Sequence, residues 1–198
     1  MKDEQVNELL YQALETELGG VQVYEMAIRC TVNEDLREEW KGYLEETENH
    51  VRIVNEVFSE LEMDTEMETP GRAIVRFKGE SLITAMQMAL DSGDMAAAQL
   101  VAAECVVDAE IKDHANWELI GEVAQGLKGP RAKVLQDAYE QVEEEEDEHL
   151  YHTQGWAREL WFESLGITAV LPPPEEQKKV KTAIGAARAE QSREEFLK

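Results

Sequence analysis

Four long segments of this chain carry apolar residues at steps of three or four positions, and no other feature constrains the fold as strongly. This spacing places the apolar side chains on one face of an α-helix, and that face leaves water by packing against other helices. The segments cover residues 3–30, 35–61, 94–127 and 131–165. They predict an all-α protein, built as an antiparallel four-helix bundle.

The apolar stripe of every segment is interrupted by ionisable residues near the middle of its length. These are Glu17 in the first segment, His50 in the second, Glu110 and His114 in the third, and Glu146 and His149 in the fourth. In a bundle they meet at one level, where isolated buried charges are strongly unfavourable. Two divalent cations would neutralise them, and mixed carboxylate and imidazole ligands suit iron, manganese or zinc.

The spacing of Glu146 and His149 fits a shared ion, because residues at i and i+3 lie on one helix face. Di-metal carboxylate bundles use this Glu-x-x-His pair on two helices and a single glutamate on each of the other two. In the second segment the matching pair reads Thr47 and His50, so one glutamate is missing.

Glu46 and His114 are the two residues that could replace the missing ligand. Glu46 precedes His50 by four positions, and His114 shares the stripe of Glu110. The predicted ligands are therefore Glu17, Glu46, His50, Glu110, His114, Glu146 and His149. Taken singly, each has a simpler interpretation as a hydrogen-bonded core residue or part of a solvated charge run; their coincidence on all four stripes favours a metal site. Tyr24 is expected in the core, with a hydrogen-bonding or redox role beside the metals as the alternative.

The rest of the chain predicts two additions to the bundle. Residues 73–92 form a shorter connecting helix whose apolar and methionine residues are expected in the core. Three prolines at 172–174 start an extension over residues 171–198, with a short helix near 178–196, so the expected division is a bundle over 1–170 and an extension over 171–198.

The net charge and the cysteine content limit the partners and the kinds of site that this chain is expected to have. The formal net charge is −24, from 43 acidic and 19 basic residues, which disfavours nucleic acids and anionic membranes as partners. No segment is typical of a signal peptide or membrane span, so a cytoplasmic location is expected. Cys30 and Cys105 form no C-x-x-C pair and are expected as small buried hydrophobes.

Several of these motifs resemble the ferritin-like superfamily. Glu17 followed by Tyr24 resembles the opening of bacterioferritins and rubrerythrins, Glu146-x-x-His149 resembles their last-helix motif, and Glu110 stands where their third-helix glutamate falls. The stretch 43–58 is more similar to the YciE/YciF group of ferritin-like proteins, which also has a connecting segment before its third helix. The resemblance covers residues 8–165.

The resemblance implies that Glu17, Glu110, Glu146 and His149 bind metal and that His50 is the second-helix histidine. Thr47 departs from the pattern of bacterioferritins and rubrerythrins. The implied cofactor is two iron ions, with manganese or zinc as alternatives, in an oxidoreductase that reacts with peroxide or oxygen. Its reductant would be external, since there is no C-x-x-C module, and a homodimer is expected. The alternatives are a non-catalytic iron-binding or stress-response bundle and a metal-free interaction bundle with raised carboxylate pKa values.

Overall fold

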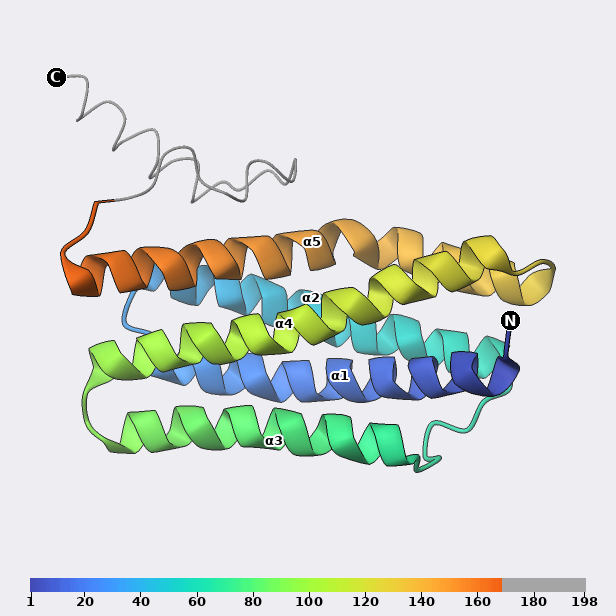
Figure 1. Ribbon diagram of the computed structural model, residues 1–198, viewed down its shortest axis with the longest axis horizontal. Helices are drawn as coiled ribbons and strands as arrows, with labels where there is room; N and C mark the ends of the chain where they lie inside the picture. The colour runs from blue at the N-terminus through green and yellow to red at the C-terminus, as the bar shows by residue number, and fades with distance from the viewer. Residues whose placement is uncertain (169–198) are drawn as a thin grey trace, which may run out of the picture.

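The computed structural model describes residues 1–168, which form five α-helices and no strand. The helices are α1 (Asp3–Cys30), α2 (Glu34–Glu60), α3 (Pro70–Asp91), α4 (Met95–Gly126) and α5 (Pro130–Leu165). Consecutive helices run antiparallel, so that α4 starts at the end of the molecule where α2 starts (Figure 1). The all-α prediction is confirmed, while the ferritin-like topology stays a prediction.

Side-chain caps explain where three of the helices begin. Asn33, Thr69 and Asp94 each accept a hydrogen bond from a backbone amide in the first turn of α2, α3 and α4. Pro70, directly after the Thr69 cap, occupies the first helical position. The sequence pattern predicted that this helix starts at residue 73, but with this cap and proline α3 begins at Pro70.

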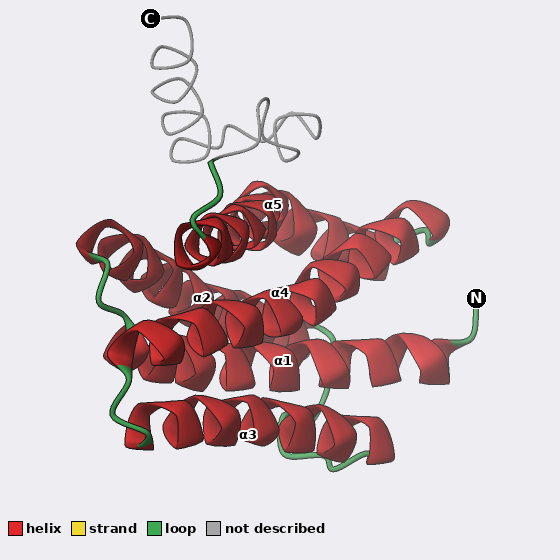
Figure 2. Cartoon of the chain, turned by 60° about the vertical axis from the view of Figure 1, so that its left-hand side comes forward, coloured by secondary structure: helices red, strands yellow, loops and turns green. Residues whose placement is uncertain are grey.

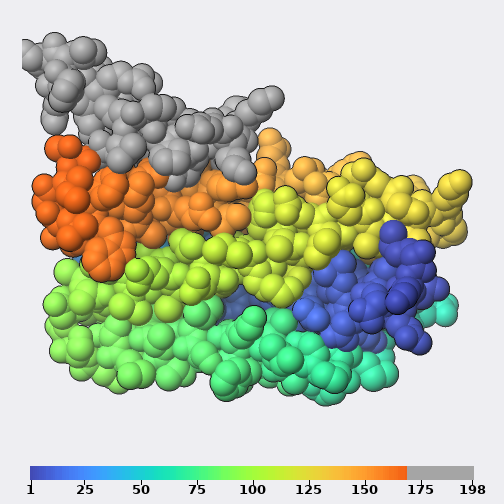
Figure 3. All heavy atoms as spheres, viewed as in Figure 1, coloured from blue at the N-terminus to red at the C-terminus, as the bar shows by residue number. Residues whose placement is uncertain are grey.

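The four long helices surround a common interior, and α3 lies outside it. Helix α1 contacts α2 and α4, and α5 contacts the same two helices, so α1, α2, α5 and α4 close a ring. Helix α3 contacts α1 and α4, on the outside of that ring (Figure 2). Figure 3 shows α3 and α4 side by side, covering much of α1.

The core consists of two apolar clusters, one toward each end of the bundle. One contains Tyr24 and Trp40, and the other contains Leu10 and Phe58. Along each of the four long helices, the two clusters are separated by 9 to 14 positions (14 to 23 in α1, 43 to 53 in α2, 106 to 117 in α4 and 142 to 156 in α5), which is about two and a half to four turns. The ionisable residues of the stripes lie in this gap, as a polar layer between two apolar ones.

One expectation for the connecting helix is wrong. Val75 and Met86 of α3 are buried, but Ile74, Phe77 and Met88 are 57%, 69% and 70% exposed. The reason is geometric: α3 packs with one side on α1 and α4, and no described helix covers its other side. Apolar composition alone could not distinguish these two sides.

Helix α3 is tied to α1 by a buried ion-pair cluster. The Arg72 Nε atom lies 2.6 Å from Glu15 Oε2, and Arg76 Nε lies 2.7 Å from Glu15 Oε1. Both Arg72 and Glu15 are buried. The cluster fixes the start of α3 on the bundle.

Two further expectations can be compared with the described residues, and a third cannot. Cys30 and Cys105 are buried free thiols, as expected. No helix within residues 1–168 has the length and hydropathy needed to cross a membrane. The extension expected at 171–198, with its short helix, lies outside the described residues.

Candidate metal centre

Six ionisable side chains from all four long helices form the polar layer. Each of them is at most 4% exposed. They are Glu17 on α1, His50 on α2, Glu110 and Asp113 on α4, and Glu146 and His149 on α5. Helices α4 and α5 thus supply four of the six.

These side chains form two groups of three that share one member. His50, Glu146 and His149 form the first group, and Glu17, Asp113 and Glu146 form the second. Within each group the potential ligand atoms all lie within 4.8 Å of one another. Glu146 belongs to both groups, which is the arrangement expected of a carboxylate that bridges two ions.

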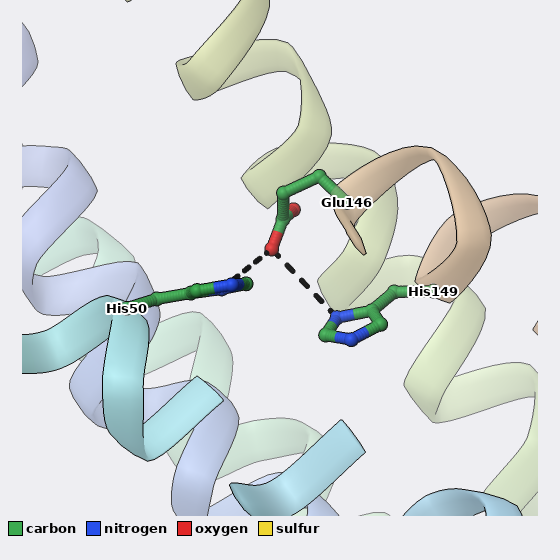
Figure 4. Close-up of side chains that lie close together, drawn as sticks. All are labelled: His50, Glu146 and His149. Atoms are coloured by element: carbon green, nitrogen blue, oxygen red, sulfur yellow. Dashed lines mark ion pairs between the residues drawn. The ribbon is translucent and has the colours of Figure 1, made fainter. Parts of the chain in front are cut away.

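The first group is shown in Figure 4, where the Glu146 carboxylate lies between the two imidazole rings. Its Oε1 atom is 3.1 Å from His50 Nδ1 and 3.7 Å from His149 Nδ1. Glu17 Oε2 is 3.7 Å from His50 Nδ1, and Glu110 Oε2 is 3.8 Å from His149 Nδ1. Both histidines therefore direct Nδ1 toward the interior carboxylates.

The other nitrogen of each ring is held by a carboxylate on the outside of the layer. His50 Nε2 lies 2.7 Å from Glu145 Oε2, and His149 Nε2 lies 2.8 Å from Glu46 Oε2. A carboxylate accepts a hydrogen bond, so it favours the tautomer with the proton on Nε2 and leaves the Nδ1 lone pair free. Metal-binding histidines in proteins are commonly oriented by such a partner. The structure thus places Glu46 beside a histidine but outside both groups.

Two aromatic residues lie beside interior glutamates across the α1–α4 interface. Trp117 Nε1 on α4 donates a hydrogen bond of 2.7 Å to Glu17 Oε1 on α1. Tyr24 on α1 lies beside Glu110 on α4, and burial together with this carboxyl raises the pKa of the Tyr24 phenol well above its usual value. Tyr24 follows Glu17 by seven positions, and Trp117 follows Glu110 by seven, so the two contacts are reciprocal.

All six side chains keep a buried nitrogen or oxygen without a hydrogen-bond partner. These atoms are Glu17 Oε2, His50 Nδ1, Glu110 Oε2, Asp113 Oδ1, Glu146 Oε2 and His149 Nδ1. Each buried unsatisfied polar group costs about 1–3 kcal/mol, and more for a charged group, so six in one layer require compensation. Four carboxylates and two imidazoles are a donor set that fits a pair of divalent cations.

Burial also changes the protonation of the layer. It raises the pKa of Glu17, Asp113 and Glu146 well above the usual range, and the pKa of Glu110 to about 7. Neighbouring carboxylates raise the pKa of Glu17 further. Burial lowers the pKa of His50. Without a cation the carboxyl groups therefore tend to keep protons, and a bound cation favours the ionised forms.

Neither His114 nor Thr47 offers the polar layer an unoccupied ligand atom. His114 lies on the outer side of α4, with Nε2 2.7 Å from Asp147 Oδ1. The Thr47 hydroxyl donates to the backbone carbonyl of Tyr43, so it is occupied. The inward position next to His114 belongs to Asp113, which the stripe analysis missed. Its signal was present, because Asp113 follows Glu110 by three positions, as His149 follows Glu146.

A surface pocket leads to the layer on the side of α4 and α5. It has a volume of about 120 Å³. Its lining combines the buried Glu146 and Trp117 with acidic and aromatic residues nearer the surface: His114, Glu118, Tyr139, Glu143 and Asp147. The pocket is the right size for a few water molecules or a small oxidant.

Comparisons of the chain with family models, with curated proteins and with solved structures gave no match. The interpretation of the site therefore rests on its geometry and on the resemblance of its motifs.

Proposed function

We propose that this protein is a ferritin-like di-metal carboxylate protein that binds two divalent ions, with iron as the physiological metal, and reacts with peroxide or oxygen. The observation that carries the proposal is the layer of six buried side chains with unpartnered donor atoms. Four long helices each contribute to this layer, and Glu146 belongs to both groups of donors. Di-iron bundles share these features, although their ligand plan has a second Glu-x-x-His pair where this chain has Thr47 and His50.

The surrounding residues support a reactive centre in several ways. Glu145 and Glu46 orient the two histidines, and Trp117 holds Glu17. The apolar clusters above and below the layer exclude water from it. A pair of ferrous ions held by these residues would supply the two electrons needed to reduce one peroxide to two waters, with two protons from solvent.

The acidic pocket supports access for both reactants. Glu118, Glu143 and Asp147 line its outer part and attract cations toward Glu146. Its volume of about 120 Å³ is sufficient for peroxide or oxygen. An external reductant and a homodimer remain part of the proposal.

The second candidate function is a metal-holding stress protein without turnover. Thr47 favours it, because the symmetric site of active di-iron enzymes has a glutamate at that position. The two candidates share the metal site and differ only in reactivity toward oxidants.

The first experiment is anaerobic loading with Fe(II), desalting and elemental analysis. We expect about two irons per chain in the unaltered protein, and their loss in a Glu146→Ala/His149→Ala variant. The matched control is Glu140→Ala/Glu144→Ala, at exposed positions of the same helix, which should keep the metal. Equal iron in the unaltered protein and the site variant would refute the proposal.

The second experiment separates the two functions. Peroxide is added to the Fe(II)-loaded protein, and ferric absorbance is followed against free Fe(II) at the same concentration. Oxidation faster than the free-ion rate supports the enzyme. Tight binding with oxidation no faster than that of the free ion supports the metal-holding protein.

A further inference from the structure

We infer that the two metal positions are chemically different: one has two imidazoles and takes a borderline transition-metal ion, while the other has oxygen ligands alone and prefers a hard ion such as Mn(II) or Mg(II). This inference rests on the proposed function and specifies which ion each position takes. The first position is the group of His50, Glu146 and His149. The second is the group of Glu17, Asp113 and Glu146.

The two histidines lie together rather than one at each position. Their rings are stacked, with centroids 5.7 Å apart and an interplanar angle of 30°. Both Nδ1 atoms approach the same oxygen, Oε1 of Glu146, at 3.1 and 3.7 Å. One ion near that oxygen can therefore accept both imidazoles.

The second position has only oxygen donors. Glu17 Oε2 and Asp113 Oδ1 are buried and have no hydrogen-bond partner, and neither belongs to the group that contains the histidines, although Glu17 Oε2 lies 3.7 Å from His50 Nδ1. The other oxygen of Glu17 accepts the Trp117 hydrogen bond, which leaves Oε2 for an ion. Three carboxylates with water as the remaining ligands are a typical environment for Mn(II) or Mg(II).

The asymmetry follows from two neighbouring features of the sequence. Thr47 removes a carboxylate from α2, one turn before His50, and its hydroxyl is bound to the backbone. Asp113 restores the carboxylate from α4, beside Glu17. The number of buried carboxylates stays at four, but the fourth now lies among oxygen ligands and not beside a histidine.

Each position should bind most tightly the ions that suit its ligand atoms. Imidazole nitrogen favours Co(II), Zn(II) and Fe(II) over Mn(II), following the general order of divalent-ion affinity. A position without nitrogen loses most of this discrimination. One Co(II) should therefore bind at the histidine position and leave the oxygen position available to Mn(II).

The experiment adds one equivalent of Co(II) to the chelator-treated protein and then titrates Mn(II). Co(II) is followed by its visible absorption, and free Mn(II) by its electron paramagnetic resonance signal. Asp113→Asn should weaken Mn(II) binding by about tenfold or more and leave the Co(II) spectrum unchanged, because losing even an outer partner of a ligand costs about 10–100-fold. His50→Gln and His149→Gln should each weaken Co(II) binding and leave Mn(II) binding in place.

The matched control is Asp108→Asn, which changes an exposed aspartate of the same helix, α4, outside both groups. It should alter neither metal, and circular dichroism shows whether each variant folds. One histidine variant acting on Co(II) and the other on Mn(II) would mean one imidazole at each position and would overturn the inference. Equal loss of both metals in Asp113→Asn would also overturn it. Absence of Co(II) and Mn(II) binding altogether would instead refute the proposed function.

Discussion

In the metal-free state, the stability of this protein should fall as the pH rises from about 5 to about 8, which is unusual for an acidic site. The cause is the buried carboxyl layer. The Glu110 pKa is raised from 4.5 to about 7 in the folded chain. Between those values the folded state holds a proton that the unfolded state has lost, so raising the pH favours unfolding.

The size of the effect can be worked out for Glu110. Each pKa unit corresponds to about 1.36 kcal/mol, so the change contributes roughly 3 kcal/mol, lost progressively until the pH exceeds about 7. Glu17, Asp113 and Glu146 act in the same direction, because their pKa values are also raised. His50 opposes them, since its lowered pKa makes stability increase as the pH rises toward the ordinary histidine value of 6.5.

The assay is thermal unfolding of the chelator-treated protein, followed by circular dichroism across this pH range. A domain of this size changes its Tm by about 2–4 °C per kcal/mol, so the Glu110 contribution alone corresponds to roughly 6–12 °C. Sodium chloride at about 1 M reduces the Debye length to about 3 Å and suppresses repulsion between surface charges. Saturating Zn(II) should remove the trend, because bound cations keep the carboxylates ionised.

Glu110→Gln is the variant that tests the reasoning. Its amide resembles the protonated carboxyl in shape and cannot titrate. The decrease in Tm between about pH 5 and about pH 8 should therefore be smaller by the roughly 6–12 °C that Glu110 contributes. A Tm that stays flat or rises with pH in the chelated protein would refute the argument. An unchanged pH dependence in Glu110→Gln would refute the assignment to this residue.

Three further predictions concern other parts of the structure. Glu46→Gln should weaken Co(II) binding by about 10–100-fold, measured by competition with a coloured chelator, because Glu46 orients His149; unchanged affinity would mean that the contact has no role. Arg72→Met should lower the free energy of unfolding in urea by about 1.5–3 kcal/mol, because Glu15 loses its closest partner and keeps only Arg76; an unchanged free energy would mean that Arg76 alone compensates Glu15. Phe77→Ser should change that free energy by no more than about 0.5 kcal/mol, because the ring is 69% exposed; a large loss would show that the ring is covered in solution.

The sequence predicted the helices and most of the polar layer because both depend on helical periodicity. Glu17, His50, Glu110, Glu146 and His149 interrupt apolar stripes, and such an interruption is visible without a structure. All five lie in the buried layer. Their role as metal ligands remains a prediction.

Asp113 and His114 show where periodicity reaches its limit. Both follow Glu110 at a spacing that keeps them on nearly the same helix face, three and four positions later. The rotation of α4 against its neighbours decides which one points inward, and that rotation depends on packing across the whole bundle. Histidine is a common metal ligand, so the sequence analysis chose His114 as the inward residue, but the structure buries Asp113. Periodicity also could not predict which carboxylates orient the imidazoles, because these contacts join distant parts of the chain: Glu145 and His50 are 95 positions apart.

Because α4 and α5 supply four of the six donors, the centre is completed late in the synthesis of the chain. His149 follows Glu17 by 132 positions (149 − 17), and a ribosome adds about 5–20 residues per second, so roughly 7–26 seconds separate the two. During that interval the nascent chain has Glu17 and His50 but neither group of three. A new molecule therefore begins with neither group complete, and before any ion could bind, its carboxyl layer is stabilised by protons and by the apolar clusters on either side of it.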